Sequence, residues 1–288
     1  MVGKVGNTRR RRTTWPVRAA ASAAGAALLV GGCGAGGGEE AGPSPSASGR
    51  AATASASGSP SAAPSAAASG GGTAQPTPFT VAPARLPRTK PQAESLVQAV
   101  ALEPQAWGSG FRAQRPAASA PGTVAVLDAQ CRWQRLPLPG SVLASSSRYS
   151  ELPGTGGKGT LKVTAAVTVH TSVGTADEQL ATTLEEALRC RDQQVRTDER
   201  ISGLASVAVP YGQGGNTYAD DSVLEIGSYL TGNSAQTYRW HVARLGSVTV
   251  AVSVMGAKGY KDDELTRYSS HALTTMLSRI ESELGGKN

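Results

Sequence analysis

The chain has 288 residues, of which 39% are hydrophobic and 17% charged, and its formal net charge is +7. Lys4, Arg9–Arg12 and Arg18 supply six of the 28 basic residues, and no acidic residue precedes Cys33. The remaining 22 basic residues face 21 acidic ones, so the chain beyond Cys33 is almost neutral. This balance excludes a strongly basic nucleic-acid-binding surface, and we predict no nucleic-acid partner.

The first 32 residues have the pattern of a signal peptide. A basic head is followed by residues 19–30, a run of about 12 uncharged small and apolar residues. That length lies within the roughly 7–15 residues of a signal sequence and falls short of the roughly 20 that a membrane-spanning helix needs. We therefore predict that residues 1–32 direct export.

Val30, Gly31, Gly32 and Cys33 follow directly. This order resembles the lipobox of bacterial lipoproteins, which implies cleavage before Cys33 and attachment of lipid such as palmitate to its sulfur. The predicted location is the outer face of the cell membrane, with the lipid bilayer as a partner. The alternative is a soluble secreted protein that is cleaved at another small residue. The export route stays open, since the adjacent arginines of Arg9–Arg12 also suit a twin-arginine signal.

Residues 33–90 consist largely of Ala, Gly, Ser, Pro and Thr. Such a segment buries too little apolar surface to offset the entropy of ordering it, so we predict a disordered linker. As a flexible coil it would reach roughly 40–45 Å. Its Ser, Thr and Pro content also suits O-glycosylation.

Residues 91–288 are predicted to form a single domain, whose first half contains one helix and three strands. The helix is expected over residues 94–102 and ends before Pro104. Strands are expected over 123–128 and 142–149. A third strand is expected over 161–169, where apolar residues alternate with mostly polar ones and so indicate one buried face.

A second helix is predicted over residues 176–191. Thr175 and Glu178 fit the capping box S/T-x-x-E at its start. Four apolar residues recur at helical spacing and should share one buried face. They are Leu180, Leu184, Ala187 and Leu188.

The last third predicts three strands, over 222–230, 237–244 and 247–255. The last two form a hairpin around Gly246, which can adopt a positive φ. An amphipathic helix follows Asp262. Strands that pair locally, with helices before, between and after them, indicate an α+β fold in which a mostly antiparallel sheet packs with amphipathic helices.

Three cysteines are present, and assigning Cys33 to lipid leaves Cys131 and Cys190 as a pair. In an oxidising compartment these two can form a disulfide, for which chain entropy predicts a stabilisation on the order of 4 kcal/mol. The alternative is two separate buried thiols. Neither cysteine has the close partner of a zinc motif, so we predict no metal site.

The sequence contains no recognisable catalytic signature. His170, His241 and His271 lie outside any H-E-x-x-H pattern, and there is no G-x-S-x-G elbow. We predict no catalytic residue and no cofactor. Tyr211, Trp240 and His241 are the candidate ligand-binding residues, because aromatic and amphipathic side chains often line pockets.

The order of elements resembles the extracellular sensor domain of mycobacterial PknH-type kinases and related actinobacterial lipoproteins. The resemblance rests on the opening helix, the segment Cys131-Arg132-Trp133, the helix that ends at Cys190, the strand pair around Gly246 and the final helix. It implies an antiparallel sheet backed by helices and a cleft for an unidentified ligand.

The function predicted from the sequence is therefore a membrane-anchored extracytoplasmic lipoprotein with a ligand-binding or sensor-like domain. Its partner would be a small molecule, lipid, glycan or protein of the cell envelope. Two alternatives remain open: a cell-envelope hydrolase of the esterase or glycosidase type with an unrecognised site, and a purely structural envelope lipoprotein.

Overall fold

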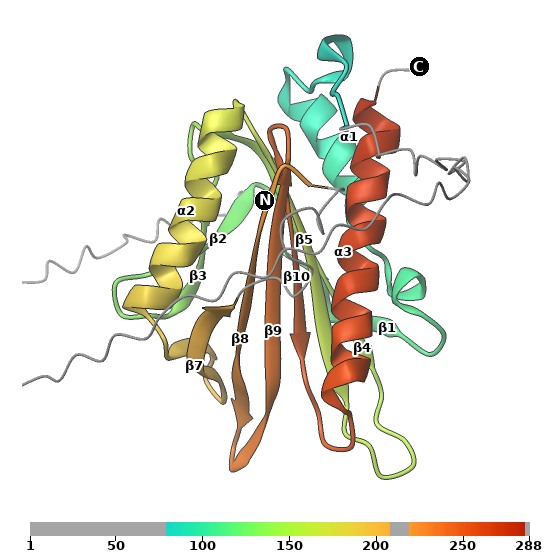
Figure 1. Ribbon diagram of the computed structural model, residues 1–288, viewed down its shortest axis with the longest axis vertical. Coiled ribbons are helices and arrows are strands. Elements are labelled where there is room, and N and C mark those ends of the chain that lie inside the picture. Colours follow the sequence, from blue (N-terminus) through green and yellow to red (C-terminus); the bar gives the residue numbers. More distant parts are fainter. Residues whose placement is uncertain (1–78, 208–218, 286–288) are drawn as a thin grey trace, which may run out of the picture. The chain divides into compact units, whose positions relative to one another are not determined.

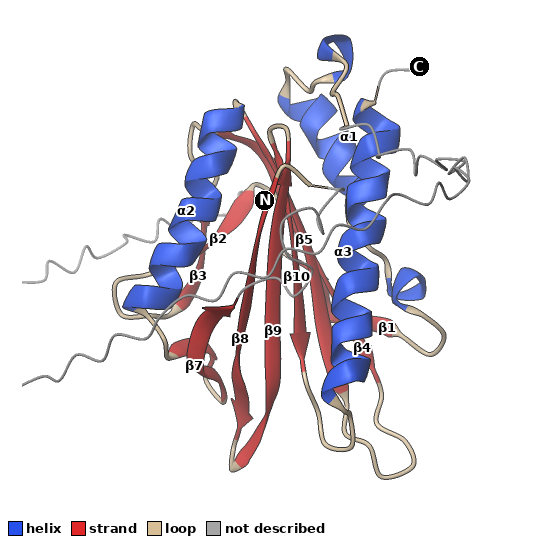
Figure 2. Cartoon of the chain, in the orientation of Figure 1, coloured by secondary structure: helices blue, strands red, loops and turns tan. Residues whose placement is uncertain are grey.

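The computed structural model of the protein describes residues 79–207 and 219–285. Figure 1 traces the helices and strands of this part of the chain, and Figure 2 colours them by type. The predicted lipid-attachment residue Cys33 and the ligand-binding candidate Tyr211 lie outside the described residues. In chain order the elements are η1 (Pro83–Arg85), α1 (Lys90–Val100), η2 (Pro104–Trp107), β1 (Arg112–Ala118), β2 (Thr123–Leu127), β3 (Trp133–Pro137), β4 (Val142–Leu152), β5 (Leu161–His170), α2 (Val173–Arg189), β6 (Gln193–Arg196), β7 (Glu199–Val207), β8 (Asp221–Thr231), β9 (Ser234–Leu245), β10 (Val248–Met255) and α3 (Asp262–Leu284).

Eight of the strands form one antiparallel sheet in the order β1-β4-β5-β10-β9-β8-β7-β6. The other two, β2 and β3, pair with each other as a separate antiparallel hairpin. The predicted hairpin between β9 and β10 is present, and Gly246 in its turn has a φ of 59°. The α+β fold with a mostly antiparallel sheet is therefore confirmed.

One face of the sheet packs against α1 and α3. Strand β5 places Val163, Ala165 and Val167 on this face with no exposed surface. Strand β10 adds four valines, as its alternation predicts, and α3 covers them with a long apolar stripe. The buried residues of that stripe include Leu265, Ala272, Met276, Ile280 and Leu284.

The opposite face is covered as well, which the alternation in the sequence does not indicate. Helix α2 stands over this face, on the other side of the sheet from α1 and α3 (Figure 1). Leu180 and Ala187 of α2 contact two small apolar clusters on the strands beneath. The polar members of β5, such as Thr164 and Thr168, therefore face protein and a cavity rather than bulk solvent.

Helix α2 differs from the prediction in its start and in its buried face. It begins at Val173 with Ser172 as its N-cap, and Thr175 completes the capping box instead of opening the helix. This cap lies one turn earlier because the Ser172 side chain accepts a hydrogen bond from the Thr175 backbone N–H. Leu184 is 42% exposed and Leu188 is 83% exposed, so the predicted four-residue apolar face is wrong at these two positions.

Sequence patterns also missed four strands, β1, β3, β6 and β7. Strands β1 and β6 form the two edges of the large sheet, β7 lies between β6 and β8, and β3 belongs to the β2–β3 hairpin. Helix α1 begins four residues before its predicted start, because Thr89 and Gln92 form a capping box there. None of the described helices is long and apolar enough to cross a membrane.

Candidate functional site

A cavity of about 620 Å³ lies on the α2 face of the sheet. Its floor is made by β4, β5, β10 and β9. Its roof is made by α2 and the β2–β3 hairpin. The volume falls in the range of roughly 300–1,000 Å³ that small-molecule sites occupy.

The floor of the cavity is rich in hydroxyl groups. Because side chains alternate along a strand, the residues of β5 that face away from the valine core face the cavity together. The same holds for the neighbouring strands. The hydroxyl-bearing floor residues are Ser145, Ser147 and Tyr149 of β4, Thr164 and Thr168 of β5, Tyr238 of β9, and Thr249 and Ser253 of β10.

Two indole rings supply apolar surface. Trp133 comes from the hairpin and Trp240 from β9, and their ring centroids are 6.4 Å apart with the planes tilted by 57°. Trp240 also packs against the apolar clusters beneath α2. The cavity thus combines a polar floor with an aromatic wall, an arrangement suited to a ligand that has both polar and apolar parts.

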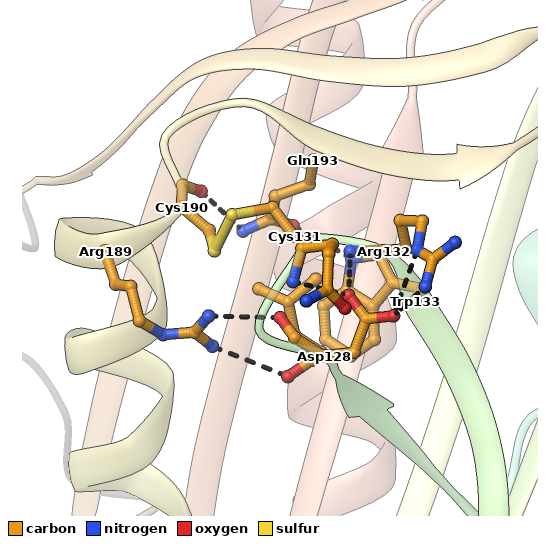
Figure 3. The surroundings of a disulfide bond; sticks show 9 residues. Asp128, Cys131, Arg132, Trp133, Arg189, Cys190 and Gln193 are labelled. Atoms are coloured by element: carbon orange, nitrogen blue, oxygen red, sulfur yellow. Dashed lines mark hydrogen bonds and ion pairs between the residues drawn. A yellow bond between two sulfur atoms is a disulfide. The ribbon is translucent and has the colours of Figure 1, made fainter. Parts of the chain in front are cut away.

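The roof is held together by a covalent link. Cys131, in the turn of the hairpin, forms a disulfide with Cys190, the residue that ends α2 (Figure 3). The predicted pair is therefore confirmed. Cys131 has a φ of 58°, a backbone conformation that non-glycine residues seldom adopt, and Gln194 donates a backbone hydrogen bond to its carbonyl oxygen.

Hydrogen bonds around the disulfide strengthen this link. Arg189 donates from Nη1 to the Asp128 carbonyl oxygen at 3.0 Å (Figure 3). Trp133 donates from Nε1 to Gln193 Oε1 at 2.9 Å, and Gln193 in turn donates to the Cys190 carbonyl oxygen at 3.0 Å. We refer to Asp128, Cys131, Trp133, Arg189, Cys190 and Gln193 as the clamp. It joins the two parts of the roof at one end of α2.

A polar network lies toward the other end of α2. His170 is buried, and its Nε2 lies 2.8 Å from Gln179 Oε1 and 3.2 Å from Thr249 Oγ1. Thr249 also donates to Gln179 Oε1 at 2.7 Å. Burial lowers the pKa of His170, while the hydrogen bond with Gln179 opposes this effect. The imidazole is thus a structural bridge between the floor and α2.

The roof also contains a carboxyl group whose charge is disfavoured. Burial raises the pKa of Glu186 on α2 to about 7, against the opposing effects of Arg189 and of a hydrogen bond with the Leu127 backbone. Glu225 on β8 behaves in the same way. Burial raises its pKa to about 7. The negative charge of Glu186 adds to this effect, and a hydrogen bond with the Ser206 hydroxyl opposes it.

The ligand-binding candidates from the sequence are placed apart. Trp240 lines the cavity. His241, the next residue on β9, projects from the opposite face, on which Arg239 pairs with Asp262 at the start of α3. Burial lowers the pKa of His241 to about 4, and the charge of Arg239 adds to this effect. His271 is exposed on α3, so the three histidines occupy three different places.

Sequence reasoning missed Arg135 of β3, which lines the cavity from the hairpin. Nothing in the local pattern marks this residue, because an arginine in a short polar segment resembles an ordinary surface residue. The described residues contain no group of three or more His, Cys, Asp or Glu side chains that is arranged to hold a metal ion.

No family model matches the sequence, and no curated protein does. Two solved structures are similar to the chain. One is the extracellular domain of PknH from Mycobacterium tuberculosis, with 11% identity, a TM-score of 0.42, and coverage of 65% of this chain and 97% of that one. The other is an uncharacterised Rv0999 ortholog from Mycobacterium smegmatis, with 10% identity, a TM-score of 0.30, and coverage of 59% and 90%. Similarity at this level does not transfer a ligand or a function to this chain.

Proposed function

We propose that this protein is a lipid-anchored extracytoplasmic binding module that takes a small molecule of the cell envelope into the cavity beneath α2. The observation that carries the proposal is the cavity itself. It has the volume of a small-molecule site, a hydroxyl-rich floor and an aromatic wall, and the clamp fixes its roof. A site whose walls are already in place binds with a smaller entropic cost.

The cellular location in this proposal rests on chemistry at two places in the chain. The order basic head, apolar run and Val30-Gly31-Gly32-Cys33 supports acylation of Cys33. The disulfide between Cys131 and Cys190 supports an oxidising compartment, where such bonds persist. Mass spectrometry of the native protein tests the anchor. We expect an N-terminal diacyl or triacyl cysteine, and an unmodified Cys33 thiol would contradict it.

A thermal-shift screen against fractionated cell-envelope extracts tests the binding function. A ligand that binds only the folded protein raises its melting temperature, with about 2.7 kcal/mol of stabilisation at a concentration 100 times Kd. The matched control is Ala166→Phe, which places a ring in the cavity. A fraction that shifts the wild type and leaves this variant unchanged supports the proposal. No shift with any fraction, or equal shifts in both proteins, counts against it.

A further inference from the structure

The chemistry of the cavity wall indicates the class of ligand, and this inference rests on the function proposed above. Arg135 extends from β3 in the roof to β4 in the floor. Its Nη2 donates to Ser147 Oγ at 2.6 Å and to the Tyr149 hydroxyl at 2.8 Å. The two hydroxyls hold the guanidinium in place, but both are neutral.

The charge of Arg135 is not matched by a carboxylate. Within residues 79–207 and 219–285 no Asp or Glu forms an ion pair with it, and its Nη1 is buried without a hydrogen-bond acceptor. A buried charged donor without a partner costs free energy, so such groups normally have one.

The other cation of the cavity wall provides a contrast. Arg196 lines the same cavity and pairs with Glu199, its Nη1 lying 2.5 Å from Oε2. Of the carboxyl groups in the described part of the chain, those of Glu178 and Glu186 on α2 also line the cavity, and neither forms an ion pair with Arg135. Arg196 therefore has a carboxylate partner, whereas Arg135 has none among the described residues. An anionic ligand could neutralise the positive charge of Arg135.

A guanidinium presents five N–H donors in a planar fork that matches carboxylate, sulfonate and phosphate groups. Around it the floor offers hydroxyls, and Trp133 and Trp240 offer apolar surface. We propose that the cavity binds a small organic oxyanion, with its anionic group on Arg135 and its apolar body against Trp240.

A pair of fluorescent probes with the same ring skeleton tests this proposal. 8-Anilinonaphthalene-1-sulfonate carries an oxyanion, and N-phenyl-1-naphthylamine lacks it. The protein is the full chain with Cys33→Ala, so that no acyl chain binds the probes, made in an oxidising compartment so that the disulfide forms. We expect Arg135→Gln to weaken binding of the sulfonate about tenfold or more and to change binding of the neutral probe less than twofold.

Arg267→Gln is the matched control, because it removes the same charge from α3 on the other side of the sheet. It should leave both affinities unchanged, and an unchanged melting temperature shows that each variant is folded. Equal loss of both probes in Arg135→Gln, or no loss of either, overturns the oxyanion site while the binding function stands. Failure of both probes to bind the parent chain overturns both proposals.

Competition identifies the source of the oxyanion. Octyl phosphate is a free molecule, and vesicles of phosphatidylglycerol present a phosphate in a lipid head group. Displacement of the sulfonate probe by octyl phosphate alone supports a free ligand. Displacement by the vesicles supports a lipid head group. If neither competitor displaces the probe, both a free alkyl phosphate and a phosphatidylglycerol head group are contradicted as the source of the oxyanion.

Discussion

The two faces of the sheet are built by the same strands but differ in their side chains and in how they are packed. Toward α1 and α3 the central strands present valines and alanines with no exposed surface, and helix side chains fill the space above them. Toward α2 and the hairpin the same strands present threonines, serines and small residues, and a cavity of about 620 Å³ remains above them. One face therefore forms the packed hydrophobic core, and the other face forms the floor of the cavity.

Polar residues at alternate positions of a strand do not always face solvent. On the first face each buried side chain gains close-packed contacts, which stabilise the fold. On the second face most of the hydroxyl-bearing residues, such as Ser147, Thr168 and Thr249, are buried although they are polar, because α2 and the β2–β3 hairpin cover them. Deleting or enlarging a side chain should therefore change stability on one face and ligand binding on the other.

The sharpest test uses two adjacent alanines on β5. Ala165 is fully buried in the valine core, and Ala166 lines the cavity. Ala165→Phe should lower the free energy of unfolding by more than about 3 kcal/mol, because a packed core cannot accept the ring. Ala166→Phe should change it by less than about 1 kcal/mol, because the cavity can. Urea unfolding measures both, and equal losses would show that the two faces are packed alike.

The clamp should have the next largest effect. Replacing Cys131 and Cys190 by Ala removes a link between residues 59 apart in sequence. We expect a loss of about 2–4 kcal/mol in the free energy of unfolding, measured by urea titration. The variant should also bind cavity ligands more weakly than the wild type at temperatures at which it is still folded, since the hairpin and α2 are no longer covalently joined. Unchanged binding in the folded variant would show that the roof does not need the disulfide.

A buried carboxyl on the cavity side allows a test by pH. Burial raises the pKa of Glu225 from 4.5 to about 7. Between these values the unfolded chain loses this proton before the folded protein does, so the free energy of unfolding falls as the pH rises. Glu225→Gln removes that fall.

This variant should be more stable than the wild type at pH 8, by about 3 kcal/mol, and equal to it at pH 4. Urea unfolding at the two pH values measures the difference. Glu283→Gln, an exposed position on α3, is the control and should show no such pH dependence. A gain that is the same at both pH values would show that the pKa of Glu225 is not the cause.

The smallest effect is expected on the outer side of α2. Leu188 is 83% exposed although its spacing places it with the apolar residues of the helix. Leu188→Gln should change the free energy of unfolding by less than about 0.5 kcal/mol. A thermal melt of this variant measures the change. A large loss of stability would mean that the Leu188 side of α2 also packs against the rest of the protein.

Much of the fold could be predicted from local patterns. The alternation over β5, the hairpin at Gly246 and the apolar stripe of α3 identified elements that the structure contains, because periods of two and of 3.6 residues report directly on one buried face. The prediction that Cys131 pairs with Cys190 depended on assigning Cys33 to lipid, with two separate thiols as the alternative, and the structure contains the disulfide. The predicted start of α2 was wrong because both Ser172 with Thr175 and Thr175 with Glu178 can form a capping box. In the structure Ser172 is the N-cap.

The site could be predicted only in part. Trp240 was chosen for its side chain and lies on the cavity wall, whereas its neighbour His241 lies on the other face because adjacent strand residues point in opposite directions. Arg135 carries no local mark of its role. It contributes to the site only because the hairpin folds back over β4 and brings it to Ser147 and Tyr149.

The sequence by itself determined the α+β class and the main strands and helices, because these depend on composition and periodicity within a stretch of chain. The signal and lipid-attachment segment stays a prediction from the same kind of local pattern. Only the tertiary structure decided that the polar face of the sheet has a roof, that a cavity remains beneath it, and that Arg135 faces that cavity with no carboxylate partner among residues 79–207 and 219–285. These features depend on contacts between segments that are distant in sequence, and no local pattern encodes where such segments meet.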